Sequence, residues 1–210
     1  MCNWKCIRHD STQNYVFSHD KRYPPTNYLI MPDTQIPGIE CNDIFQEPLN
    51  EIWDHGWTWS RAYPGRDESL TGMAINSKCH RDQDQLHIHV SCVHATVREF
   101  LKHHDAEIPN YPAAPISRKL GPYCTSYEIV KVLSLKGGSS PFKVVQNFPR
   151  AKHRMDLQSI AVVGSQKKKQ EYFVLNSFYQ AQIEHTGHAE DLLDETCSET
   201  DDTDAPECPQ

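Results

Sequence analysis

The apolar positions of the chain fall into short runs separated by proline, glycine and polar residues, a pattern that predicts β-strands and short helices. Strands are predicted at 15–18, 28–31, 70–75, 85–91, 159–164 and 172–175. The last two predict a hairpin, with Lys167–Lys169 at its solvated tip. Apolar residues at helical spacing predict helices over 44–61 and 94–103. We expect one domain in which these helices pack on a sheet.

Three other segments have less regular patterns. Residues 107–121 contain three prolines and end in Gly121, which predicts a long loop without a regular element. Long loops in compact domains often cover a functional site. Segments 127–135 and 142–148 each fit either a strand or a short helix.

The stretch 85–91 alternates polar and apolar residues, and in a strand this period of two sends successive side chains to opposite faces. The apolar face consists of Leu86, Ile88 and Val90. The polar face is predicted to hold Gln85, His87, His89 and Ser91. We therefore expect two imidazoles on one face of a strand whose other face packs in the core, an arrangement that holds catalytic side chains in place.

Composition divides the chain into three parts. Residues 1–27 are polar with scattered aromatics and predict a loosely structured N-terminal extension, followed by the domain at 28–189. Residues 190–210 hold nine acidic residues and no Lys or Arg, so we expect a disordered acidic tail. The net charge of −7 comes mainly from this tail, and the body is close to neutral.

No apolar run approaches the length of a membrane span, and the first residues lack the apolar core of a signal peptide. A cytoplasmic location is therefore expected. Most of the eight cysteines should then be free thiols, although Cys6 and Cys197 could pair. Basic residues are not interleaved with aromatics over a face, so a nucleic-acid partner is not expected.

The histidine pair permits three interpretations. Both rings can simply occupy a polar face. They can also supply two zinc ligands, but Cys92 is expected on the opposite side of the strand and no Cys-x-x-Cys motif accompanies them. In the third interpretation, an imidazole attacks a phosphoanhydride and forms a covalent phosphoramidate.

Phosphoryl transfer depends on positioning and charge stabilisation, so the third interpretation needs further donors and cations near the histidines. The candidate catalytic residues are His87, His89, Gln85 and Asn76. The candidate phosphate-binding residues are Lys78, Arg81 and Ser91. No metal or other cofactor is expected.

Several segments, taken in order, resemble the CDP-diacylglycerol pyrophosphatase family, and the central one is similar to the histidine-triad signature. The resemblance extends from about residue 28 to residue 197. Its residues are Tyr28–Pro32, Ala74–Ser77, Gln85–Cys92, Val97-Arg98, Ser140–Phe142 and Tyr172–Leu175.

The resemblance implies an α+β, histidine-triad-like (HIT-like) fold, with helices packed on an antiparallel sheet. It implies hydrolysis of CDP-diacylglycerol, or a related CDP-alcohol, to CMP and a phosphomonoester. His87 would be the nucleophile, His89 would contact the phosphate and Asn76 would help to orient the site. The bacterial members are membrane-anchored, so transient contact with a membrane surface is also implied.

Two residues depart from the family pattern. Gln85 stands where the first triad histidine is expected, and an amide donates a hydrogen bond but cannot carry a proton to a leaving group. Asp82 places a carboxylate near the phosphates, which is unfavourable unless Lys78 or Arg81 offsets its charge. Two alternatives therefore stay open: the same fold recruited to other small-molecule acid–base chemistry, and a non-catalytic nucleotide-binding module.

Overall fold

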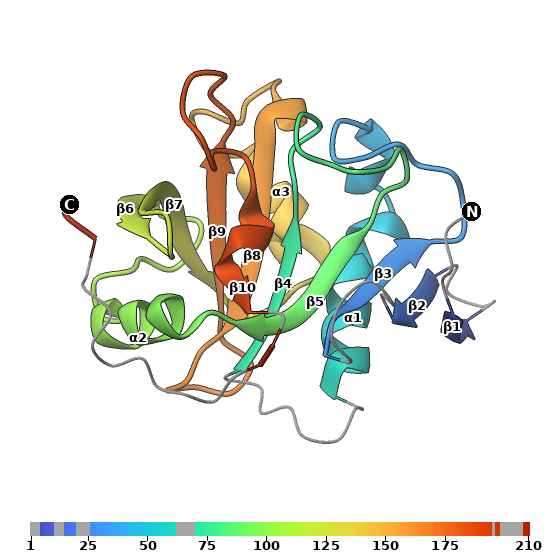
Figure 1. Ribbon diagram of the computed structural model, residues 1–210, viewed down its shortest axis with the longest axis horizontal. Helices are drawn as coiled ribbons and strands as arrows, with labels where there is room; N and C mark the ends of the chain where they lie inside the picture. Colours follow the sequence, from blue (N-terminus) through green and yellow to red (C-terminus); the bar gives the residue numbers. More distant parts are fainter. Residues whose placement is uncertain (1–4, 11–14, 20–25, 62–69, 195, 198–207) are drawn as a thin grey trace.

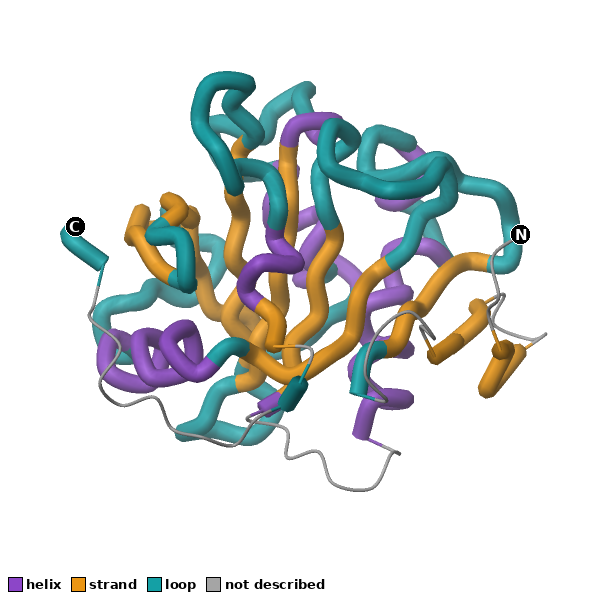
Figure 2. Tube along the Cα trace, in the orientation of Figure 1, coloured by secondary structure: helices purple, strands orange, loops and turns teal. Residues whose placement is uncertain are grey.

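The computed structural model describes residues 5–10, 15–19, 26–61, 70–194, 196–197 and 208–210. Within these ranges ten strands form one sheet, and every paired strand is antiparallel to its neighbour (Figure 2). The strand order is β1-β2-β3-β5-β4-β8-β9-β7-β6, and β10 pairs with β5. The bounds are β1 Lys5–Asp10, β2 Tyr15–His19, β3 Tyr28–Pro32, β4 Thr71–Ile75, β5 Ile88–Val93, β6 Ile116–Leu120, β7 Thr125–Val132, β8 Gln158–Gly164, β9 Tyr172–Phe178 and β10 Leu193–Asp194.

Apolar residues cover both faces of the sheet. On one face lie α1 (Ile52–Arg61) and α3 (Pro141–Gln146), whose buried side chains include Trp53 and Phe142. On the other face lie α2 (Ala95–His104) and the 3₁₀ turn η6 (Ala189–Leu192) (Figure 1). Alternate residues of the central strands contribute to each layer, as the period of two requires. The α+β class is therefore confirmed, whereas the HIT-like fold stays a prediction.

The predicted strands at 28–31, 70–75, 159–164 and 172–175 are confirmed as β3, β4, β8 and β9, and the helix at 94–103 is α2. The hairpin is also confirmed, since β8 pairs with β9. Segment 127–135 forms a strand, β7, and segment 142–148 forms a helix, α3, which has Pro141 in its first turn.

Two predictions of regular structure are corrected. The helix expected from Ile44 begins only at Ile52, after the 3₁₀ turns Asn42–Phe45 and Leu49–Glu51. Pro48 explains the late start, because a proline disfavours helical backbone in the residue before it. The irregular loop expected over 107–121 is wrong in its last part, which forms β6. This strand pairs with β7 along its whole length, and its side chains alternate in exposure.

The N-terminal segment is part of the sheet. The strand predicted at 15–18 is β2, which pairs with β3 and buries Tyr15 and Phe17 completely in the core. The strand β1 then pairs with β2. The expected loose extension is therefore wrong for 5–10, whereas the short strand expected at 15–18 is confirmed; residues 1–4, 11–14 and 20–25 lie outside the described residues.

The predicted C-terminal tail begins inside ordered structure. η6 and β10 occupy 189–194, because Ala189, Leu192 and Leu193 are buried on the second face of the sheet. An added Cβ at Gly72 of β4 would lie 2.6 Å from Leu193 and 2.8 Å from Val93, so only glycine lets β10 pack this closely. The rest of the predicted tail at 198–207 lies outside the described residues.

Two disulfides join the C-terminal segment to the sheet region, Cys92–Cys197 and Cys124–Cys208. The suggested pairing of Cys6 with Cys197 is therefore wrong, as is the expectation of free thiols at these four positions. Cys41 and Cys79 are free cysteines in the described part of the chain. No helix formed by the described residues has the length and apolar character needed to cross a bilayer.

Candidate active site

The two histidines lie together on the face of the sheet that η6 covers. His89 is on β5 opposite Ala74 of β4, and His87 comes one residue before β5 begins. Their ring centroids are 5.0 Å apart, and the residues are 4% and 7% exposed. Ile88 and Val90 point into the core on the opposite face, as the alternation predicts.

The His87 side chain is held in one tautomer and is uncharged. Its Nδ1 lies 2.7 Å from the carbonyl oxygen of Gln85, which can only accept, so Nδ1 carries the proton and Nε2 keeps its lone pair. Burial, followed by the charge of neighbouring His89, lowers the pKa of His87 to about 4. At neutral pH the ring is therefore a neutral imidazole with its one proton on Nδ1.

Glu190 joins the site from η6. One carboxylate oxygen lies 3.0 Å from Nδ1 of His89, and the other accepts a hydrogen bond of 3.0 Å from the Asn76 amide. The backbone N–H of Glu190 donates to Asn76 Oδ1 at 3.1 Å. Burial raises the pKa of Glu190, but the contact with His89 and the hydrogen bond from Asn76 lower it to about 2. A permanent negative charge therefore lies beside His89.

The backbone before η6 carries Glu190 to the strand ends. Gly187 has a φ of +73°, which favours glycine, and an added Cβ there would lie 2.8 Å from Ser77 Oγ. The carbonyl of Gly187 accepts a hydrogen bond of 3.0 Å from the N–H of Ser77, next to Asn76. The close approach of these backbones places η6 directly over the end of β4.

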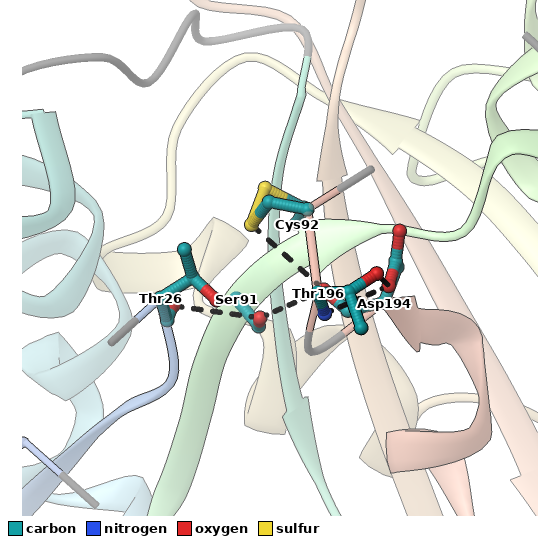
Figure 3. Close-up of a disulfide and its surroundings, with 6 residues drawn as sticks. Thr26, Ser91, Cys92, Asp194 and Thr196 are labelled. Atoms are coloured by element: carbon teal, nitrogen blue, oxygen red, sulfur yellow. Dashed lines mark hydrogen bonds between the residues drawn. A yellow bond between two sulfur atoms is a disulfide. The ribbon is translucent and has the colours of Figure 1, made fainter. Parts of the chain in front are cut away.

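The Cys92–Cys197 disulfide holds the other end of this segment (Figure 3). Beside it, β10 pairs with β5, with Asp194 opposite Cys92. Ser91 is buried and donates a hydrogen bond of 3.0 Å to the carbonyl of Asp194. Ser91 is therefore occupied in fastening β10, which does not match its expected role in binding phosphate.

A second histidine cluster adjoins Glu190. Nδ1 of His188 lies 2.6 Å from one oxygen of Asp191, and Nδ1 of His185 lies 3.0 Å from the other. Nε2 of His188 faces Glu190 at 3.9 Å. The ring of His80 lies 5.3 Å from that of His188. Neither Glu190 nor His188 was among the predicted site residues: Glu190 lies in the segment predicted to be an acidic tail, and His188 comes just before it in a segment without a recognisable motif.

Gln85 does not join the histidine face. Its amide donates to the backbone carbonyls of Pro32 and Thr34, at 3.2 and 3.0 Å. The prediction for this side chain is wrong because β5 starts at Ile88, so the strand alternation does not extend back to Gln85. Its backbone carbonyl contributes instead, by accepting from His87.

The two candidate phosphate-binding cations are paired with carboxylates. Arg81 contacts Glu40 at 2.6 Å and Asp84 at 2.7 Å, and its side chain is 12% exposed. Lys78 is 54% exposed and lies 4.0 Å from Glu40. Arg81 is therefore committed to an ion-pair network, whereas the more exposed Lys78 approaches Glu40 only to 4.0 Å.

Cys92 is not available as a zinc ligand, because its sulfur forms a disulfide with Cys197. Among the residues that the structure describes, no three His, Cys, Asp or Glu side chains converge as a metal site would require.

Comparisons with known proteins agree with the resemblance. The family model for CDP-diacylglycerol pyrophosphatase matches residues 2–201. A probable CDP-diacylglycerol pyrophosphatase from Mycobacterium leprae is 41% identical over 86 residues, or 38% of this chain and 32% of that protein. The CDP-diacylglycerol pyrophosphatase of Yersinia pestis is 26% identical over 183 residues, or 84% of this chain and 69% of that protein. The chain thus spans about a third of the first relative and about two thirds of the second.

A solved structure of a DUF4931 family protein from Bacillus cereus superposes with a TM-score of 0.46 and 6% identity, over 82% of this chain and 84% of that one. That likeness is too distant to bear on the fold. The family match covers nearly the whole sequence and includes both site histidines. The chain therefore belongs to the CDP-diacylglycerol pyrophosphatase family, whose members are named as hydrolases of a phosphoric anhydride.

Proposed function

We propose that this chain hydrolyses CDP-diacylglycerol, or a related CDP-alcohol, to CMP and a phosphomonoester through a nucleotidyl-histidine intermediate. The observation that carries the proposal is the state of His87. Its Nδ1–H donates to the carbonyl of Gln85, and its buried ring is neutral. The lone pair on Nε2 is therefore available to attack phosphorus.

In the first step, Nε2 of His87 forms a bond to the phosphorus of the cytidylyl group, and the phosphomonoester leaves. Water then attacks the same phosphorus and releases CMP, while the electrons of the N–P bond return to His87. His89 lies beside the nucleophile, with its ring centroid 5.0 Å from that of His87, and is assigned to the phosphate oxygens in both steps. Asn76 does not contact the substrate itself but positions Glu190 through two hydrogen bonds.

A lipid substrate bears on the predictions about partners and location. Transient contact with a membrane surface stays a prediction, as do the cytoplasmic location and the absence of a nucleic-acid partner. The lysines at the hairpin tip fit the last of these, because Lys168 lies 3.4 Å from Glu171 and Lys167 lies 3.8 Å from Asp105. Their charges are partly offset within the chain.

The proposal is tested by intact-protein mass spectrometry after brief incubation with a short-chain CDP-diacylglycerol, quenched at alkaline pH. We expect a mass increase of one cytidylyl group, because a phosphoramidate on His87 survives this quench. His87→Ala should abolish both the adduct and CMP release. His103→Ala, at an exposed position in α2, should leave them unchanged.

Other outcomes would redirect the proposal. CMP release that is unaffected by His87→Ala would refute His87 as the nucleophile. Tight CMP binding without hydrolysis would favour the nucleotide-binding module. Failure of the wild-type chain to bind or cleave any CDP-alcohol would favour the fold's recruitment to other acid–base chemistry.

A further inference from the structure

Displacement at the anhydride leaves charge on the departing oxygen, and none of the expected residues is placed to protonate it. Gln85 has no proton to give, and its amide is bound to the backbone of Pro32 and Thr34. His87 is the neutral nucleophile, whose one ring proton is held by the Gln85 carbonyl, and His89 is assigned to the phosphate oxygens, with its Nδ1 3.0 Å from Glu190. The proton donor must therefore come from another part of the chain.

His188 lies on the far side of the Glu190 carboxylate. One oxygen of this carboxylate is 3.0 Å from His89 Nδ1, and the other is 3.9 Å from His188 Nε2. The single carboxylate thus lies between the β5 histidines and His188. The charges of Glu190 and Asp82 act on both His87 and His188, so these two rings border the same charged region.

The environment of His188 suits a proton donor. Its Nδ1 is held by Asp191 at 2.6 Å, while Nε2 is too far from Glu190 for a hydrogen bond. The side chain is 29% exposed, which leaves it accessible to a substrate and to water.

The groups that face His188 come from three elements: Asp191 and Glu190 in η6, His80 and Asp82 in the segment after β4, and His185 in the segment before η6. Burial lowers the pKa of His188, but the hydrogen bond to Asp191 and the surrounding carboxylates outweigh burial and raise it. The pKa of His80 is instead lowered by burial and by the charge of His188. His188 is therefore the ring of this pair that carries the proton.

We propose that His188 is the general acid that protonates the leaving phosphate, the role that Gln85 cannot perform. The inference rests on the proposed hydrolysis and adds its proton donor. As the bond between His87 Nε2 and phosphorus forms, the bond from phosphorus to the bridging oxygen breaks, and that oxygen takes the proton from His188 Nε2. Neutral His188 then accepts a proton from the water that attacks the adduct, which restores both histidines.

The experiment compares two substrates with His188→Asn in the full chain. One is a short-chain CDP-diacylglycerol, and the other is the p-nitrophenyl ester of CMP, whose leaving group departs without a proton. We expect kcat/KM to fall about 10²- to 10⁴-fold on the first substrate and only a few-fold on the second. His103→Asn is the matched control and should cleave both substrates as the wild type does.

Each other outcome has a distinct meaning. An equal loss on both substrates would show that His188 is merely structural and would overturn the inference, as would no loss on either. Normal cleavage of the p-nitrophenyl ester by His188→Asn also shows that the variant is folded. If the wild-type chain cleaves neither substrate, the proposed function itself fails.

A second variant keeps the imidazole and changes its environment. Asp191→Asn removes the carboxylate that holds His188, so the pKa of His188 should fall. Because a general acid must be protonated, the basic limb of the pH profile for the CDP-diacylglycerol should move to lower pH. An unmoved basic limb would contradict the assignment.

Discussion

The carboxylate of Glu190 connects three parts of the site. It contacts His89, accepts from Asn76 and faces His188. Its low pKa, about 2, means that its negative charge is present at neutral pH. At the scale of single residues, Glu190 is therefore a positioning group that places a negative charge 3.0 Å from His89.

Replacing Glu190 by glutamine should lower kcat/KM for the CDP-diacylglycerol about 10- to 100-fold. The physical reason is the loss of the negative charge beside His89 and of the charge in the hydrogen bond from Asn76, a type of interaction that contributes about 1.5–3 kcal/mol. Steady-state kinetics measure the effect. The matched control is Glu107→Gln, whose exposed carboxylate pairs with Arg118 away from the site and should leave the kinetics unchanged. Wild-type kinetics in Glu190→Gln would remove Glu190 from the mechanism.

At the scale of elements, the short segment from η6 to β10 completes the site. It is held by backbone pairing with β5, by the close approach of Leu193 to Gly72, and by the Cys92–Cys197 disulfide. The disulfide spans a sequence separation of 105 residues. A cross-link over such a distance removes much chain entropy from the unfolded state.

Breaking that cross-link should affect stability and activity together. We expect Cys197→Ser to lower the free energy of unfolding by about 2–4 kcal/mol. We also expect a lower kcat/KM, because η6 carries Glu190 and His188. Urea denaturation and kinetics under non-reducing conditions measure both effects. Cys79→Ser, at an exposed free cysteine, is the matched control, and equal behaviour of the two variants would show that the disulfide does not hold η6.

At the scale of the whole molecule, two buried groups link stability to pH in the same direction. His87 has a folded pKa of about 4, below its ordinary value of 6.5, so the unfolded chain binds more protons between these values. Glu190 has a folded pKa of about 2, below its ordinary value of 4.5, and acts in the same way over that lower range. The stability from both groups is present at neutral pH and is lost as the pH falls.

Urea unfolding measured from pH 7 to pH 4 should therefore show a steady loss of stability, of about 3 kcal/mol from His87. His87→Asn should flatten the profile in this window, because asparagine does not titrate. His103→Asn should keep the wild-type slope. A His87→Asn profile as steep as that of the wild type would mean that the buried ring is protonated in the folded chain.

The sequence pattern alone was sufficient for much of the sheet and for the centre of the site. The alternation around Ile88 and Val90 predicted that His87 and His89 share a face, and the apolar run before Asn76 predicted the strand that delivers it. These predictions held because they depend on local periodicity, which a strand converts directly into the direction of its side chains. The ambiguous segment that became α3 shows the limit for short apolar runs, where strand and helix periods are hard to distinguish.

Only the tertiary structure decided how the histidines are completed. Asn76 and Glu190 are 114 residues apart in the sequence. The acidity of the last twenty-one residues predicted a disordered tail, although two of them, Leu192 and Leu193, are buried and fasten this segment to the sheet. Arg81 is basic in sequence, but Glu40 and Asp84 neutralise it in space. The physical reason is the same in both cases: local sequence determines the conformation of a segment, whereas long-range burial and charge pairing determine which segments meet.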